Sequence, residues 1–343
     1  MIQWLNSHKV LSIVIVLGLL SGLLMMIFHP AHPHRFSDAT FQVVKGWWPG
    51  WEAFQLGVLE KEESQGLHRT KFIQTDDYQK AAEIFKREET DAATLTIFEA
   101  LVLASQGVDF KIVLLIDYTT GSDGLVAHQH INHIRELLGK RIGVVKGTIS
   151  HFTVLKALEK AGLTSDDVIL VEYDDESLLQ AFTNKKVDAI GTYEPVMSKI
   201  VGSSYGKIIF SSSEIPRAIC DVLLVKGSLI RKKSEILSHW IKSWAMALNE
   251  FNLNQDRFFF KVGTLGKTEK DIVESSFKGI FLTDFRENIV AIGHKNQPGY
   301  LFRSLEQMNR FMVEQKVIPK PVNISEMIYF DSVKLMPVSG GEH

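Results

Sequence analysis

Tryptophan side chains gather in one short segment of the chain. Three of the six tryptophans, Trp47, Trp48 and Trp51, lie in WWPGW (47–51), directly after the β-branched run FQVVKG and directly before a helix-like run. Loops from a strand to a helix in α/β folds lie at the carboxyl edge of the sheet, where ligands bind. Indole rings there can stack on a flat ligand or pack against a cation. The segment predicts an aromatic wall of a ligand site, with at least one ring expected to fill the core instead.

A second candidate is GTIS (147–150), which follows the strand-like run RIGVV and opens a helix-like run. Gly147 permits close approach of the backbone, and Thr148 or Ser150 can cap the helix. Backbone N–H groups at such a helix start can also hold a polar or anionic ligand group. Capping alone would explain these residues, so both interpretations stay open.

The segment DYTTGSDG (117–124) ends the strand-like run KIVLLI with side chains that accept hydrogen bonds. Tyr118 could stack on a ligand, and Asp117 or Asp123 could accept from one. Ordinary turn chemistry explains the same composition equally well.

TYEP (192–195) ends the strand-like run VDAIG in the same way. Pro195 suits the first turn of a helix. Tyr193 and Glu194 would then point from a strand end into any neighbouring cleft.

Histidines cluster at His128, His130 and His133, but the spacing spans a predicted strand end and a loop. Without carboxylates nearby we interpret them as polar loop residues rather than metal ligands. The sequence contains no Ser-His-Asp elbow, HExxH, P-loop or GxGxxG motif. We therefore predict no catalytic residues, no metal and no cofactor.

The elements that must position these segments are short β-branched runs alternating with helices of 10–15 residues from Thr40 onward. This alternation is typical of βαβ units and a parallel sheet. From 228 to 318 the pattern becomes mostly helical, with Ile236, Trp240 and Trp244 on one face. The fold class predicted is α/β with a helical C-terminal region.

The N-terminal region holds 19 residues without a charge, Val10 to Phe28. A helix needs about 20 apolar residues to cross a bilayer, whereas a signal-peptide core is about 7–15 residues long. We expect 1–28 to be an uncleaved anchor in preference to a cleaved signal peptide, and 29–39 to be a linker. The chain is then membrane-tethered or exported.

Charge and cysteine content exclude several classes of protein. The chain of 343 residues has 38 Lys and Arg against 40 Asp and Glu, which argues against nucleic-acid binding. Cys220 is the only cysteine, which excludes an internal disulfide framework, a thiolate zinc site and an iron–sulfur cluster.

Taken in order, five stretches resemble the solute-binding proteins that serve ABC importers of the nitrate, sulfonate, taurine and thiamine-precursor type. The string LLGKRIGVVKGTISH is similar to that family's L-K-G-K-x-I-G-V-x-x-G-S/T-x-x-H pattern. The matching stretches are 90–101, 108–127, 134–163, 187–195 and 215–225.

The resemblance implies a two-lobed periplasmic-binding-protein fold of type II, with lobe one at 40–127 plus 223–343 and lobe two at 128–222. The two crossovers would act as hinges for closure around a ligand. It also implies a cleft between the lobes. The residues expected to line it are Trp47, Trp48, Trp51, Thr94, Thr96, Tyr118, Thr120, Ser122, Gly147, Thr148, Ser150, Tyr193 and Glu194.

The ligand class follows from the chemistry of these loops. An anion wants Arg, Lys or several N–H donors, and the loops offer only Lys45 and Lys146 as cations against Asp117, Asp123 and Glu194. We therefore favour a thiamine-type aminopyrimidine or related heterocycle over a sulfonate, taurine or nitrate.

The expected partner is an ABC permease at the extracytoplasmic face of the membrane. Because relatives are usually released or lipid-anchored, the predicted N-terminal helix leaves room for a second possibility, a ligand sensor acting through a separate membrane partner. An enzyme acting on a heterocycle is the weakest alternative, because no nucleophile–base pair is evident.

Overall fold

The computed structural model describes residues 40–75, 78–232 and 234–337. The predicted membrane anchor at Val10–Phe28 and the predicted linker at 29–39 lie outside these residues. Within the described ranges, none of the helices combines the length and the apolarity needed to cross a bilayer.

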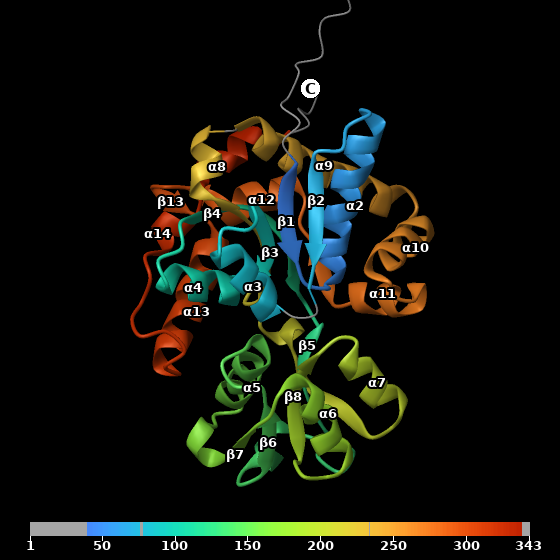
Figure 1. Ribbon diagram of the computed structural model, residues 1–343. Helices are drawn as coiled ribbons and strands as arrows, with labels where there is room; N and C mark the ends of the chain where they lie inside the picture. Colours follow the sequence, from blue (N-terminus) through green and yellow to red (C-terminus); the bar gives the residue numbers. More distant parts are fainter. Residues whose placement is uncertain (1–39, 76–77, 233, 338–343) are drawn as a thin grey trace, which may run out of the picture. The chain divides into compact units, whose positions relative to one another are not determined.

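The first sheet has six strands in the order β11-β4-β10-β3-β1-β2. Figure 1 labels β1, β2, β3 and β4 of this sheet. β1 is parallel to β2 and β3, whereas β10 is antiparallel to both β3 and β4. The central strands β3, β4 and β10 are almost wholly buried, as expected for strands covered on both faces. The bounds are β1 Phe41–Lys45, β2 Thr70–Gln74, β3 Ala92–Thr96, β4 Phe110–Thr119, β10 Cys220–Lys226 and β11 Ile280–Leu282.

The second sheet has five strands in the order β7-β6-β8-β5-β9. β6 is parallel to β7 and β8, and β5 is antiparallel to β8 and β9. The bounds are β5 Asp123–His128, β6 Arg141–Val144, β7 Ile169–Glu172, β8 Ala189–Tyr193 and β9 Gly206–Ser211.

Helices follow most strands. Those that come before β10 are α2 Pro49–Ser64, α3 Tyr78–Lys86, α4 Ile97–Ser105, α5 Ile149–Lys160, α6 Asp175–Thr183 and α7 Val196–Gly202. Those that follow are α8 Gly227–Lys232, α9 Ser234–Leu253, α10 Gln255–Gly266, α11 Lys270–Phe277, α12 Phe285–Ile292, α13 Tyr300–Glu314 and α14 Ile324–Met327. A short hairpin, β12 Gly293–His294 and β13 Gln297–Pro298, lies between α12 and α13.

The predicted helical C-terminal region packs onto the first sheet through α9, which lies beside α2 in Figure 1. Trp240 and Trp244 of α9 are fully buried. Gly57 of α2 lets the two helices approach closely, because a Cβ there would lie 2.4 Å from the backbone oxygen of Ser243.

The prediction of parallel sheets is only partly right. The chain passes directly from β4 to β5 in the other sheet and returns from β9 to β10 through one short 3-10 turn, Ser212–Glu214, without an α-helix. Strands that enter a sheet in this way run antiparallel to their neighbours.

These crossovers also lie earlier than the lobe boundaries expected at 127/128 and 222/223. β5, which begins at Asp123, belongs to the second sheet, and β10, which begins at Cys220, belongs to the first. The six-stranded sheet is the centre of lobe one, and the five-stranded sheet is the centre of lobe two.

Candidate functional site

Two buried carboxyl groups face each other near the crossovers, where β4 ends and β10 begins. Asp117 pairs with Asp221 in the antiparallel register, and the two residues are 0% and 2% exposed. Burial raises the pKa of Asp117 to about 7 and raises the pKa of Asp221 well above its ordinary value. The negative charge of Asp117 adds to the rise in the pKa of Asp221, so the pair resists carrying two negative charges.

The predicted tryptophan loop reaches this pair. Trp48 is buried, and its indole Nε1 donates a hydrogen bond of 3.2 Å to Oδ1 of Asp117. The other carboxylate oxygen lies against the first turn of α2, where a Cβ on Gly50 would be 1.9 Å from Oδ2. The positive end of the α2 dipole therefore faces Asp117.

The other two tryptophans pack against protein groups other than the carboxyl pair. Trp51 is fully buried in the core and makes an edge contact of 5.0 Å with the ring of Tyr78. Trp47 is half-buried, and its indole packs against Gly266 of α10. The structure thus brings one tryptophan of the three to the buried carboxyl pair.

A third carboxyl group, Asp123 at the start of β5, lies on the lobe-two side of the crossover and is 4% exposed. Burial raises its pKa to about 7, the Thr119 hydroxyl opposes this shift, and the negative charge of Glu194 adds to it. Among the described residues, its Oδ2 has no hydrogen-bond partner. Buried carboxyl oxygens are normally hydrogen-bonded, so a bound molecule or a water is needed to donate a hydrogen bond to this one.

Tyr78, at the start of α3, was missed by sequence reasoning. Its ring lies 6.3 Å from that of Tyr193, which ends β8 in the second lobe, at an interplanar angle of 38°. Its hydroxyl donates to the backbone oxygen of Trp47 at 3.3 Å, and its pKa is raised by burial and then by the charges of Tyr193, Asp221 and Asp123. The signal available in the sequence was its position shortly after the carboxyl end of a strand, β2.

Thr94 and Thr96 of β3 have different surroundings. Thr96 is the N-cap of α4 and forms a reciprocal capping box with Glu99. Thr94 pairs with Leu223 of β10, so it shares a face of the sheet with Asp221 two residues away. The Thr94 side chain is fully buried, and its hydroxyl has no partner within the described part of the chain.

The two lysines counted as cleft cations are engaged elsewhere. Lys45 is fully buried and pairs with Glu52 of α2, and it also donates to Gln74 at 2.9 Å. Lys146 is exposed and lies 3.9 Å from Glu172.

The start of α5 is the predicted GTIS segment. Gly147 has φ +70°, a conformation that favours glycine, and its N–H donates to Nδ1 of His151 at 3.2 Å. The Thr148 hydroxyl donates to the oxygen of Val145 at 2.7 Å and does not cap the helix. The first N–H groups of a helix have no intrahelical acceptor, so this helix start offers donors to a ligand. Ser150, in the first turn, is buried.

Glu194, by contrast, serves α7. Its carboxylate accepts from the backbone N–H of Ser198 at 3.1 Å and from the Ser198 hydroxyl at 3.0 Å. Its own backbone N–H donates to the oxygen of Ser122.

Thr120 and Ser122 in the crossover are tied to lobe one. Both backbone N–H groups donate to the oxygen of Gly279, and the Ser122 hydroxyl donates to that of Ser276.

Tyr118 is enclosed by protein groups, with its ring stacked on Phe281 at 4.9 Å and under the guanidinium of Arg217 at 5.8 Å. The same guanidinium lies 4.3 Å from the ring of Tyr300 and forms an ion pair of 3.0 Å with Glu287.

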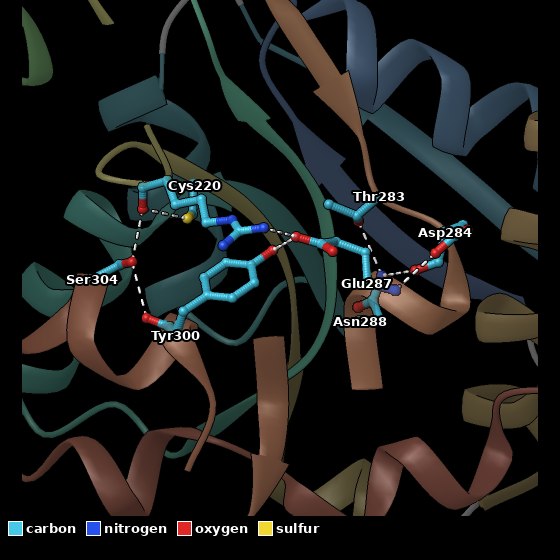
Figure 2. A network of polar contacts seen from close by, with 8 residues as sticks. Cys220, Thr283, Asp284, Glu287, Asn288, Tyr300 and Ser304 are labelled. Atoms are coloured by element: carbon cyan, nitrogen blue, oxygen red, sulfur yellow. Dashed lines mark hydrogen bonds and ion pairs between the residues drawn. The ribbon is translucent and has the colours of Figure 1, made fainter. Parts of the chain in front are cut away.

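Figure 2 shows the network of polar contacts that includes Glu287, Tyr300, Ser304 and Cys220. The Tyr300 hydroxyl donates to Glu287 at 2.8 Å, and the Ser304 hydroxyl and the Cys220 thiol both donate to the backbone oxygen of Arg217. The network fixes the second crossover to α12 and α13 of lobe one.

The histidine cluster lies apart from these groups. His128 stacks on Phe182 at 4.2 Å, and its Nε2 lies 3.1 Å from the oxygen of Val187. Within the described residues, no group of three or more His, Cys, Asp or Glu side chains is placed to hold a metal ion.

Part of the chain matches a family model, and several known proteins are similar to it. Residues 123–251 match the family model described as "NMT1/THI5 like". A binding protein of Brucella abortus is 33% identical over 88 residues, which are 26% of this chain and 28% of that protein, so the match spans less than a third of that relative's length. The taurine-binding periplasmic protein of Escherichia coli is 22% identical over 232 residues, covering 65% of this chain and 70% of the relative.

Solved structures agree with the fold. The periplasmic aliphatic sulphonate binding protein of Escherichia coli superposes with a TM-score of 0.72 at 13% identity, covering 87% of this chain and all of that one. The desulfurization enzyme DSZB has the same fold, with a TM-score of 0.64 at 14% identity over 86% of this chain and 98% of the enzyme. Residues 123–251 of this chain are thus similar to the NMT1/THI5-like family, and the chain has the two-lobed α/β fold seen in the periplasmic sulfonate-binding proteins.

Proposed function

We propose that this protein captures a small sulfonate of the taurine type between its two lobes and delivers it to an ABC importer. The observation that carries the proposal is the open N-terminus of α5. Relatives named for taurine and for aliphatic sulfonates support the same ligand class. This choice differs from the heterocycle favoured by the sequence.

The four helices that start near the crossovers differ in what occupies their first turn. α2 faces Asp117, α4 has the Thr96 capping box, and α7 is capped by Glu194. α5 has no side-chain cap at Thr148. A sulfonate is an anion with three acceptor oxygens, and backbone N–H groups at a helix start are suited to bind it without a lysine or arginine. The sequence argument, which counted cationic side chains, overlooked these donors.

Binding without covalent chemistry fits the one cysteine. Cys220 is buried, donates to the oxygen of Arg217, and has a pKa raised by burial and by Asp221. A thiol in this state is a poor nucleophile. The fold itself is compatible with catalysis, as DSZB shows, so the proposal rests on the residues rather than on the fold.

A thiamine-type aminopyrimidine is the second candidate ligand. The tilted pair Tyr78 and Tyr193, one ring from each lobe, offers flat faces to a heterocycle. The carboxyls of Asp117 and Asp123 would accept hydrogen bonds from its amino group.

We place the protein at the extracytoplasmic face of the membrane, held there by Val10–Phe28 or released by cleavage after it. A permease is the expected partner. The alternative is a membrane sensor that reads the closed, ligand-bound lobes.

Isothermal titration calorimetry on the full-length chain in mild detergent tests the ligand class. Taurine, butanesulfonate, nitrate, thiamine and a 4-aminopyrimidine are titrated in turn. Saturable heat from the sulfonates supports the proposal. If only thiamine or the aminopyrimidine gives saturable heat, the sulfonate is wrong and the second candidate ligand replaces it.

The variant Ile149→Pro tests the site. Proline is tolerated at the first helical position, and Thr148 before it already has the extended backbone that proline requires, with φ −127° and ψ 175°. The change removes one N–H donor, whereas the control Ile149→Ala removes side-chain packing and keeps the donor. We expect Ile149→Pro to bind sulfonates about tenfold or more weakly than Ile149→Ala, because a hydrogen bond to a charged group contributes about 1.5–3 kcal/mol. Equal sulfonate affinities of Ile149→Pro and Ile149→Ala would show that the start of α5 does not bind the sulfonate.

A further inference from the structure

Two adjoining cavities lie on lobe one between α9, β11 and α12. The larger has a volume of about 490 Å³ and the smaller a volume of about 260 Å³. None of the residues considered above for the cleft lines either cavity. Sites for small molecules usually have volumes of about 300–1,000 Å³, so the larger cavity is big enough to hold one.

The larger cavity has apolar walls. The ring of Phe251 on α9 stacks on that of Phe277 on α11, with their centroids 6.0 Å apart. Phe281 of β11 and Val290 of α12 are 45% and 60% exposed, although both side chains are large and apolar. The other apolar lining residues are Leu248, Ile280 and Leu282. A contiguous apolar surface that is open to solvent is typical of a binding site.

Polar side chains line the smaller cavity and the place where the two cavities meet. Asn249 and Asn252 come from one face of α9, and Arg286 lies four residues before Val290, on the same face of α12. Within the described part of the chain, the side chains of Asn249, Asn252 and Arg286 have no hydrogen bond or ion pair. The site therefore has an apolar end and a polar end.

The two carboxylates on the lining already have protein partners. Asp284 accepts a hydrogen bond of 2.7 Å from the backbone N–H of Glu287 and so caps α12. Glu287 accepts from the Tyr300 hydroxyl at 2.8 Å and pairs with Arg217 at 3.0 Å (Figure 2). Arg286 therefore has donors to spare, and the polar end favours a ligand group that accepts hydrogen bonds.

We propose that these cavities form a second ligand site, separate from the cleft between the lobes, and that it binds a small aromatic carboxylate. The aromatic body packs against Phe251, Phe277 and Phe281, because rings prefer stacked or edge contacts with other rings. The carboxylate accepts from Arg286, whose planar guanidinium matches its two oxygens. This inference does not depend on the solute bound in the cleft.

The site adjoins the strand that holds the first crossover. The ring of Phe281 stacks on that of Tyr118 at 4.9 Å. Two residues before Phe281, the oxygen of Gly279 accepts from the backbone N–H groups of Thr120 and Ser122 in the crossover. A molecule packed on Phe281 would therefore contact the element that positions the crossover.

Isothermal titration calorimetry of the full-length chain tests the site with 2-naphthoate and with 2-naphthamide, a neutral molecule of nearly the same shape. Titrations into the detergent solution alone provide the blank. We expect saturable binding of 2-naphthoate that is at least fivefold tighter than that of 2-naphthamide. Absence of saturable binding by both molecules would overturn the proposal.

The variant Val290→Glu locates the binding. It places a negative charge at the apolar end, on a side chain exposed enough for the fold to accept the change. Val201→Glu is the matched control, because Val201 is 42% exposed on α7 of lobe two. We expect 2-naphthoate to bind Val290→Glu at least tenfold more weakly than Val201→Glu. Equal affinities would show that the probe binds elsewhere and would overturn the site.

The variant Arg286→Gln tests the polar end, with Arg303→Gln as its control, since Arg303 is an exposed residue of α13 outside both cavities. We expect Arg286→Gln to lose the preference for 2-naphthoate over 2-naphthamide and Arg303→Gln to keep it. An unchanged preference in Arg286→Gln would show that Arg286 does not bind the carboxylate.

A competition titration separates this site from the cleft. We expect 2-naphthoate to bind equally well with and without an excess of taurine. Displacement of 2-naphthoate by taurine would place the probe in the cleft and overturn the second site. If taurine itself does not bind, the proposed function fails, and the comparison of Val290→Glu with Val201→Glu still decides the second site.

Discussion

The indole Nε1 of Trp48 donates to Oδ1 of Asp117 at 3.2 Å, and this hydrogen bond joins the loop before α2 to the end of β4. Both groups are buried, so neither has water as an alternative partner. The bond therefore orients the carboxyl that faces Asp221, and changes near it should affect stability and ligand binding together.

Gly50→Ala should disrupt this arrangement. The new Cβ would lie 1.9 Å from Oδ2 of Asp117, so the carboxyl would have to move away from Trp48. We expect a loss of about 1–3 kcal/mol in the free energy of unfolding, as for overpacking of a core, and weaker ligand binding. Thermal unfolding and calorimetry measure the two effects.

Gly202→Ala is the matched control, because a Cβ at that helical position meets nothing within 4 Å. Its stability should equal or exceed that of the wild type. If Gly50→Ala also unfolds like the wild type, the close approach of α2 to Asp117 is wrong.

Much of the fold could be predicted from the sequence. The strand-like runs FQVVKG, RIGVV and KIVLLI correspond to β1, β6 and the central part of β4. The strand AATLT of β3 and the strand DGLVAH of β5 were not predicted as strands, because small residues and glycine give a weak β signal. The antiparallel direction of β10 could not be predicted either, because it depends on pairing between segments far apart in the chain.

The site was predictable only in part. Strand ends indicated the loops of Trp48, Asp117 and Gly147, but pattern alone could not tell a cap from a ligand contact. Glu194 caps α7 and Thr96 caps α4, which depends on hydrogen bonds made in the folded chain. Asp221 was passed over because it lies inside an apolar strand, where its partner across the sheet became visible only in the structure.

The stability of the ligand-free protein should fall as pH rises from about 4 to about 7. Asp123 has a folded-state pKa of about 7 against 3.8 ordinarily, so in this window the folded protein holds a proton that the unfolded chain has lost. Each such group lowers the free energy of unfolding by up to about 1.4 kcal/mol per pH unit. Asp117 contributes with the same sign.

Chemical denaturation at a series of pH values measures this slope. Asp123→Asn removes one titrating group and should flatten the curve between pH 4 and 7. An unchanged slope in the variant would show that Asp123 titrates normally in the folded protein.

Lys45→Met should be strongly destabilising, because it leaves Glu52 buried without its cation. Burial already raises the pKa of Glu52, and loss of Lys45 removes the charge that opposes this. Breaking a buried pair on one side costs about 3–5 kcal/mol. The double variant Lys45→Met with Glu52→Met should recover most of the loss, as urea denaturation can measure. A single variant as stable as the double one would contradict the ion pair.

Arg217→Ala should loosen the second crossover. The guanidinium contacts the rings of Tyr300 and Tyr118 and pairs with Glu287, so its removal detaches the second crossover from α12 and α13. Because the side chain is about half exposed, we expect a loss of about 1–2 kcal/mol, mostly from the cation–π contacts.

Arg231→Ala is the control for that change, because Arg231 pairs with Asp109 at 3.2 Å while both side chains are well exposed. Its effect on urea denaturation should stay below about 0.5 kcal/mol. Equal losses in the two variants would mean that the rings around Arg217 add nothing to an ordinary surface ion pair. A different result is that Arg217→Ala loses more stability than Arg231→Ala and also binds ligand more weakly. That result would show that the contacts of Arg217 also position Asp221, which lies four residues further along the chain.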